Sequence, residues 1–185
     1  MQITGMRSLN IITECCVDTN MVETLCGVLV NHQKCCSKVT GVMEMTLNDG
    51  FAIGVIDDDK KKPTYVSQFH EIARSEHLTF LKHNDKSHYL VLVKPAADKF
   101  ILDVAKKAGV DVRNYGFSNK LKEFTGRTKT LSSDKDPDLK ALFATMSVYG
   151  EFKMLSLVLT YLNNNRYQST ETGVRDIVDS TLPCL

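Results

Sequence analysis

Apolar and polar positions alternate in blocks along the first 110 residues, and the spacing within each block predicts its secondary structure. Short apolar runs predict strands at residues 8–13, 38–45, 51–56, 78–81 and 89–93. Helical spacing predicts one helix from Asp18 or Thr19 through Leu29, one over residues 65–75 and one from Pro95 to Gly109. Alternating strands and helices predict an α/β fold, with a mostly parallel central sheet and helices on both faces.

The pattern changes after residue 110. Residues 111–136 are polar and predict a loop, and apolar spacing then predicts helices at 137–149, 151–165 and 171–179. We therefore expect an α/β core at residues 1–110. A small helical C-terminal extension, with its basic loop, should occupy residues 111–185 and pack on that core.

Composition narrows the class of protein. The chain has 185 residues, 43% of them hydrophobic, and a formal net charge of +1, so any nucleic-acid binding must come from local basic patches. No apolar run is long enough to span a membrane and no secretory leader is recognisable, which predicts a cytoplasmic protein without a membrane partner. The six cysteines include two adjacent pairs, unlike a disulfide framework, and predict reduced thiols. His32, Cys35 and Cys36 imitate half of a zinc site, but no second half with suitable spacing follows.

The strand at residues 51–56 leads directly into Asp57-Asp58-Asp59, followed by Lys60, Lys61 and Lys62. In open α/β sheets, ligands bind beyond the carboxyl ends of the strands. Crowded carboxylates repel one another, so they are tolerated when fully solvated or when they surround a cation. Both a charged solvated turn and a cation site are consistent with this stretch alone.

A second acidic residue, Glu14, follows the strand at residues 8–13. If the two strands are neighbours, Glu14, Asp57 and Asp59 open on the same edge of the sheet. Asp57 and Asp59 can then share one Mg²⁺ or Mn²⁺ ion, and Glu14 can hold a second ion or move a proton for an attacking water. Such an arrangement suits phosphoryl chemistry, which depends mainly on positioning and on charge neutralisation.

This constellation resembles the Toprim domain of topoisomerases, primases, 5S ribosomal RNA maturases and overcoming-lysogenization-defect nucleases. Glu14-Cys15-Cys16-Val17-Asp18 matches the family's Glu-Gly-x-x-Asp, and Asp57-Asp58-Asp59 matches its Asp-x-Asp. The resemblance covers roughly residues 8–110. One departure is Cys15, which stands where the family usually has a glycine, so the backbone there is less free to approach a phosphate.

The resemblance implies roles for individual residues. Glu14 would be the general acid/base, and Asp57 and Asp59 would be the metal ligands. Asp18 would support the site or cap the helix that begins there, and capping is the favoured role. Lys60 would support the metal site from the same loop.

Basic residues are interleaved with aromatic ones in the predicted loop. We expect nucleic-acid contacts from Arg113, Lys120, Lys122, Arg127 and Lys129, and a solvated loop packed by its aromatic residues explains the same pattern equally well.

Three functions are consistent with the sequence. The first is a small Toprim-like nuclease that uses Mg²⁺ or Mn²⁺. The second is a phosphoacceptor module resembling response-regulator receivers, which use a Lys-Pro after a later strand, as Lys94-Pro95 does here. The third is a non-catalytic Toprim-like binding protein. The sequence does not distinguish DNA from RNA as the substrate, and it leaves the oligomeric state open.

Overall fold

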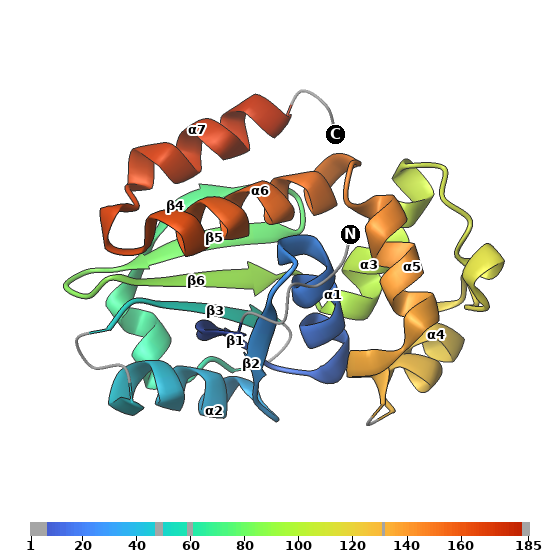
Figure 1. Ribbon diagram of the computed structural model, residues 1–185, viewed down its shortest axis with the longest axis horizontal. Coiled ribbons are helices and arrows are strands. Elements are labelled where there is room, and N and C mark those ends of the chain that lie inside the picture. The colour runs from blue at the N-terminus through green and yellow to red at the C-terminus, as the bar shows by residue number, and fades with distance from the viewer. Residues whose placement is uncertain (1–6, 47–49, 59–60, 131, 183–185) are drawn as a thin grey trace.

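The computed structural model describes residues 7–46, 50–58, 61–130 and 132–182 (Figure 1). The strands are β1 (Arg7–Thr13), β2 (Leu29–His32), β3 (Ala52–Asp57), β4 (Phe69–Arg74), β5 (Leu78–His83) and β6 (His88–Val93). The helices are α1 (Cys16–Cys26), α2 (Cys36–Gly41), α3 (Ala97–Lys107), α4 (Leu121–Thr128), α5 (Pro137–Met146), α6 (Gly150–Asn165) and α7 (Glu171–Thr181).

The six strands form one mixed sheet in the order β2-β1-β3-β6-β5-β4. Strands β2, β1, β3 and β6 run parallel to one another, whereas β5 is antiparallel to both β6 and β4. The predicted α/β class is therefore confirmed, with an antiparallel pair added at one edge of the sheet. The parallel strands all end on the same side, toward the end of the molecule where α1 and α3 lie (Figure 1).

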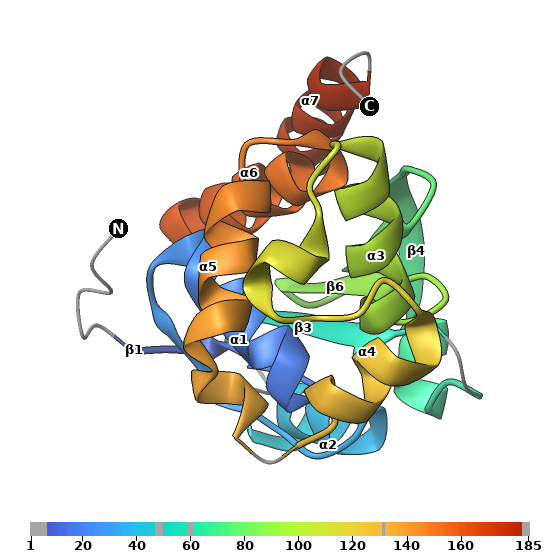
Figure 2. The same cartoon turned by 90° about the vertical axis from the view of Figure 1, so that its right-hand side faces the viewer.

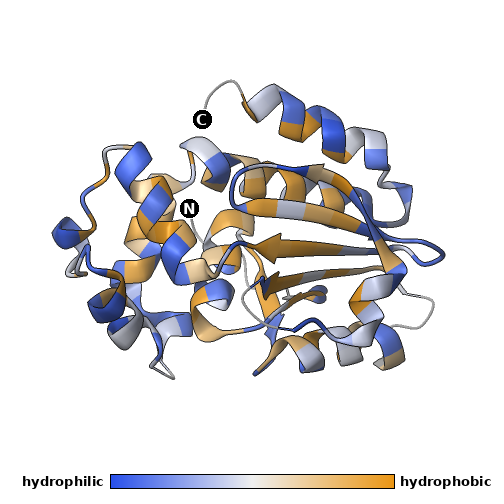
Figure 3. Ribbon diagram, turned by 180° about the vertical axis from the view of Figure 1, so that it is seen from behind, coloured by the Kyte–Doolittle hydropathy of each residue, from blue (hydrophilic) through white to orange (hydrophobic). Residues whose placement is uncertain are grey.

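Apolar side chains cover both faces of the sheet. On one face α1, α3, α5, α6 and α7 build a core in which the rings of Phe100 and Phe152 stack at 4.9 Å. On the other face, Val39 and Met43 pack against Ile56 and Leu90 of the sheet. In Figure 3 the strands and the inner sides of the helices are hydrophobic, and α7 turns a hydrophilic side outward. The helices after residue 136 thus share the core of the sheet.

The second strand is not at residues 38–45, where the sequence predicted it. Those residues lie in α2 and in a π-helical turn, Val42–Thr46, and the strand is β2 at residues 29–32. Helix α1 ends at Gly27, which adopts a left-handed conformation with φ 68° and caps the helix. The chain after Gly27 is then free to pair with β1, although the apolar spacing through Leu29 suggested a longer helix.

The helix predicted at residues 65–75 is also wrong. A 3₁₀ turn, Thr64–Gln68, leads into β4, which pairs antiparallel with β5. Strand β4 lies at one edge of the sheet, and Ile72 is its one buried residue. Its side chains therefore lack the alternation that marks a half-buried strand, and the pairing with β5 decides its conformation.

Within the predicted loop at residues 111–136 the structure contains α4 and two short 3₁₀ turns, Val112–Tyr115 and Ser133–Lys135. The three helices predicted after residue 136 are confirmed as α5, α6 and α7. Asp136 caps α5 by accepting hydrogen bonds from the backbone of Asp138 and Leu139, and Pro137 occupies the first helical position.

Candidate functional site

Strands β1 and β3 are neighbours and parallel, with Thr13 paired to Val55 in the register. Glu14 and Asp57 therefore reach the same edge of the sheet, as the sequence predicted. The backbone N–H of Asp57 donates a hydrogen bond of 3.2 Å to Oε2 of Glu14. Glu14 is only 6% exposed, so this carboxylate is held within the edge and does not project into solvent.

Asp57 also connects the sheet to the next helix on that side. Its Oδ1 accepts a hydrogen bond of 2.9 Å from the backbone N–H of Ala97, the first residue of α3. This contact places a carboxylate at the positive end of the α3 dipole. Asp57 is thereby fixed in position between β3 and α3.

Asp18 is the third carboxylate at this edge, and it is fully buried in the first turn of α1. Its Oδ2 accepts a hydrogen bond of 3.2 Å from the backbone N–H of Cys15, and Cys15 Sγ accepts one from the backbone N–H of Asp18. Asp18 therefore takes part in capping α1, but from the third helical position, because the helix begins at Cys16 and its N-cap is Cys15, where the sequence predicted Asp18 or Thr19. The Oδ1 of Asp18, however, has no hydrogen-bond partner among the described residues.

The electrostatic environment of Asp18 is unfavourable for a negative charge. Burial raises the pKa of Asp18 well above its ordinary value, and the nearby charges of Asp57 and Glu14 raise it further. By contrast, the carboxylate of Asp58, the next residue along the chain from Asp57, is paired with Lys62 at 2.8 Å and with Lys94 at 3.7 Å. The carboxyl groups of Glu14, Asp18 and Asp57 lie close enough to interact electrostatically, and we call these three residues the acidic cluster.

The acidic cluster opens onto a cleft of about 810 Å³ that Glu14 and Asp57 help to line. The first turns of α1 and α3, the end of α4 and the segment after β2 form its walls. Figure 2 looks onto the end of the molecule where α1, α3, α4 and α5 gather. The polar side chains that line the cleft, besides Glu14 and Asp57, are Cys15, Cys16, His32, Lys34, Asp98, Lys99, Thr125, Thr128, Lys129 and Thr130.

The predicted metal site is only partly visible. Asp59 and Lys60 lie outside the described residues, so the pairing of Asp57 with Asp59 stays a prediction. Within residues 7–46, 50–58, 61–130 and 132–182, no group of three or more histidine, cysteine, aspartate or glutamate side chains is arranged to hold a metal ion. His32, Cys35 and Cys36, which have the residue types of half a zinc site, are not arranged to hold a metal ion either. The five described cysteines form no disulfide with one another, and Cys184 lies outside the described part.

The five basic residues predicted to contact nucleic acid differ in their surroundings. Lys129 lines the cleft, and Lys122 is exposed on α4. The other three have carboxylate partners close by in the chain: Arg113 with Asp111, Lys120 with Glu123, and Arg127 with Asp138. The guanidinium of Arg127 also lies 4.5 Å from the ring centroid of Phe117. These pairs account structurally for much of the basic and aromatic pattern, and a role in nucleic-acid binding stays a prediction.

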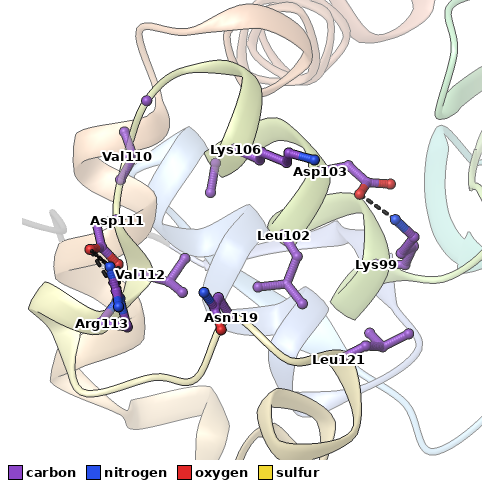
Figure 4. A pocket seen from close by; sticks show the side chains of 12 residues that line it. Lys99, Leu102, Asp103, Lys106, Val110, Asp111, Val112, Arg113, Asn119 and Leu121 are labelled. Carbon is purple, nitrogen blue, oxygen red and sulfur yellow. Dashed lines mark hydrogen bonds and ion pairs between the residues drawn. The ribbon is translucent and has the colours of Figure 1, made fainter.

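A second cavity, of about 620 Å³, lies between α3 and the segment that leads into α4 (Figure 4). Both of its carboxylates are paired with basic side chains. Lys99 pairs with Asp103, and Arg113 pairs with Asp111 at 2.7 Å. The remaining lining is largely apolar, with Leu102, Val110 and Val112 facing the space. Since both carboxylates of this cavity are held in ion pairs, the cleft beside the acidic cluster is the stronger candidate for chemistry.

The sequence did not predict that His32 and Lys34 belong to this site. Both follow from the position of β2, which pairs parallel with β1 so that His32 lies beside Thr13 at the same edge. Gly27 was the feature of the sequence that could have located β2. If it is taken as the residue that ends α1, the second strand is predicted at residues 29–32 and not at 38–45.

The chain matches no protein-family model, no curated protein and no solved structure. Across the described residues, no single helix is long and apolar enough to cross a membrane. Helix α5 and the segment Gly150–Gln168 pass that test only together, and they are bent by 95°.

Proposed function

We propose that the protein binds Mg²⁺ or Mn²⁺ at the acidic cluster and hydrolyses phosphodiester bonds of a nucleic acid in the adjoining cleft. One observation carries this proposal: Glu14, Asp18 and Asp57 crowd at the carboxyl edge of a parallel sheet, beside a cleft of about 810 Å³. Carboxylates in this arrangement repel one another unless a proton or a cation compensates them.

The chemistry of the available donors suits a hard divalent cation. Glu14 and Asp57 supply carboxylate oxygens on the wall of the cleft, and the buried Oδ1 of Asp18 lacks a hydrogen-bond partner among the described residues. Mg²⁺ is commonly bound by one or two carboxylates, with water and substrate phosphate completing its coordination. Two protein carboxylates are therefore sufficient for such a site. When bound, the cation would neutralise charge on the scissile phosphate.

The other parts of the cleft suit an anionic substrate. Lys34 and Lys129 are exposed and line the cleft, where they can contact phosphates on either side of the scissile bond. Glu14 is positioned to exchange a proton with an attacking water or with the leaving oxygen, because it lines the cleft next to Asp57. Asp57 orients Glu14 through its backbone N–H and is itself held by α3.

The resemblance to Toprim domains supports the same proposal. Glu14 follows β1, Asp57 ends β3, and the two strands are adjacent and parallel, which is the arrangement that the family's two motifs require. The departure at Cys15 has a local explanation, since its side chain takes part in the capping box of α1.

A receiver-like phosphoacceptor is the second candidate, because Lys94 follows β6, the neighbour of β3. The amino group of Lys94 lies 3.7 Å from the carboxylate of Asp58, the residue that follows Asp57. Acetyl phosphate separates the two candidates: a phosphoacceptor would form an acid-stable mass adduct on Asp57 that hydroxylamine removes, and a nuclease would not.

The direct test is a cleavage screen. The protein is incubated with single-stranded DNA, double-stranded DNA and RNA in Mg²⁺ or Mn²⁺, with an excess of chelator as the control. We expect cleavage of at least one substrate that the chelator abolishes. Cleavage of none of the substrates would favour the third candidate, a non-catalytic binding protein, and cleavage that persists in chelator would contradict a metal-dependent mechanism.

A further inference from the structure

Cys16 and His32 form a pair on the wall of the cleft. The Sγ of Cys16 lies 3.9 Å from Nε2 of His32, within hydrogen-bonding reach for sulfur, although the two residues are 16 positions apart. Cys16 is the first residue of α1, and His32 is the last residue of β2. Both side chains line the cleft, so the pair is accessible to a ligand that enters it.

The Thr19 hydroxyl lies between His32 and the backbone of α1. It donates to the carbonyl oxygen of Cys15 at 2.9 Å, and its oxygen lies 2.8 Å from Nδ1 of His32. The tautomer that carries its proton on Nδ1 completes this contact without a second proton from Thr19. In that tautomer Nε2 presents a lone pair toward the thiol of Cys16.

This arrangement contains the three parts of an activated nucleophile: a thiol, a base within reach of its proton, and a third group that orients the base. Thr19 is almost completely buried and also contacts the hydroxyl of Thr13 at 2.8 Å, which fixes its position. We propose that Cys16 is a nucleophile, with His32 as its general base, that accepts acyl groups from activated esters or thioesters in the cleft. This activity goes beyond phosphodiester hydrolysis and does not depend on it.

The reaction balances without a cofactor. The sulfur of Cys16 attacks the carbonyl carbon while its proton moves to Nε2 of His32. The bond from that carbon to the leaving oxygen or sulfur then breaks, and the leaving group takes the proton from His32. Water, deprotonated by His32, attacks the resulting thioester; the carboxylic acid departs, and the proton returns to the sulfur of Cys16.

A neutral thiol requires a base to become a strong nucleophile, and Nε2 of His32 lies within reach of the proton of Cys16. Lys34 and Lys129 also line the cleft, so esters and thioesters with an anionic leaving group suit it best.

Cys36 provides a matched control within the same chain. It is the first residue of α2 and is partly exposed, as Cys16 is at the start of α1. Among the described residues, however, no histidine hydrogen-bonds to Cys36. If Cys16 reacts faster than Cys36, the cause is therefore His32 and the cleft. The position at the start of a helix is common to both residues and cannot explain the difference.

The experiment uses 4-nitrophenyl acetate as the probe, with excess chelator present so that metal-dependent chemistry is silent. Release of nitrophenolate is followed over time, and the acetylated cysteine is located by peptide mass spectrometry. Wild type, Cys16→Ala, His32→Ala and Cys36→Ala are compared. His32 is exposed, so its replacement should leave the fold intact even if Cys16→Ala were to unfold.

We expect an initial burst with acetyl on Cys16, no burst in Cys16→Ala, and a wild-type burst in Cys36→Ala. His32→Ala should lower the rate of Cys16 acetylation by about 10²- to 10⁴-fold. Acetylation of Cys36 as fast as Cys16, an unchanged Cys16 rate in His32→Ala, or no acetylation of the wild type would each overturn the proposal. None of these outcomes bears on metal-dependent cleavage, which the chelator suppresses.

Discussion

The backbone N–H of Asp57 donates a 3.2 Å hydrogen bond to the carboxylate of Glu14, and this contact joins two residues that are 43 positions apart. It fixes the distance between the ends of β1 and β3, and it places both carboxylates on one wall of the cleft. Asp18 is buried beside them, and the negative charges of Glu14 and Asp57 disfavour its ionised form. The proposed cation site follows from this crowding of carboxylates.

Glu14→Gln should lower the rate of metal-dependent cleavage by about 10²- to 10⁴-fold, because an amide cannot exchange a proton with the reacting oxygens. The variant should remain as stable as the wild type. Its side-chain oxygen can still accept the hydrogen bond from Asp57, and the substitution removes one charge from the acidic cluster. Cleavage rates and thermal unfolding of both proteins provide the measurement. Cleavage at the wild-type rate would show that Glu14 is not the general acid/base.

Asp57→Asn should leave the stability of the metal-free protein unchanged or slightly higher. An asparagine oxygen can still accept the hydrogen bond from Ala97, and charge repulsion within the cluster is relieved. The increase in melting temperature that Mn²⁺ causes in the wild type should be lost. Asp58→Asn is the matched control, because Asp58 is paired with Lys62 outside the cluster. If Asp57→Asn retains the full shift, Asp57 is not a ligand.

Asp18 should make the protein less stable as the pH rises. Its folded-state pKa is raised above the ordinary value of 3.8, so the folded state binds this proton more tightly than the unfolded state does. The stabilising contribution is complete below about pH 3.8 and is lost progressively as the pH rises toward the folded-state pKa. Urea denaturation at pH 5 and pH 8 should show a smaller loss of stability for Asp18→Asn than for the wild type. An equal loss in both proteins would contradict the raised pKa, and Asp58→Asn again serves as the control.

Gly54 tests the packing of β3, the strand that carries Asp57. A methyl group at this position would approach Cδ1 of Leu90 and Sδ of Met43 to 2.7 Å each. Gly54→Ala should therefore lower the free energy of unfolding by about 1–3 kcal/mol. Gly126→Ala, in α4, meets no atom within 4 Å and should raise it by about 0.5–1 kcal/mol, as expected for glycine in a helix. Equal effects in urea denaturation would show that β3 is not packed as described.

The sequence predicted the elements whose apolar spacing is strong: β1, β3, α3 and the three C-terminal helices. It failed where non-local contacts decide the conformation. Strand β4 contacts only β5 within the sheet, and its exposed side chains gave no alternation. Helix α4 buries little besides Phe124 and Thr128, so no apolar stripe marked it.

The same distinction applies to the site. Glu14 and Asp57 could be predicted because each directly follows or ends an apolar strand, and parallel strands bring such positions together. The pair of Cys16 and His32 could not, because it depends on β2, which the sequence placed at residues 38–45. The burial of Asp18 near Glu14 and Asp57 could not be predicted either, because it depends on packing. An aspartate in the first turn of a helix gives the same sequence pattern whether its side chain is buried or exposed.

The most direct measurement of the central claim is an anomalous difference map from crystals of the wild-type protein soaked in Mn²⁺. We predict one strong peak in the cleft, within about 2.6 Å of a carboxylate oxygen of Glu14 or Asp57, as oxygen ligands of divalent cations require. Crystals of Asp57→Asn treated in the same way should lack that peak. A wild-type map with no Mn²⁺ at the acidic cluster would contradict the claim that these carboxylates hold a divalent cation.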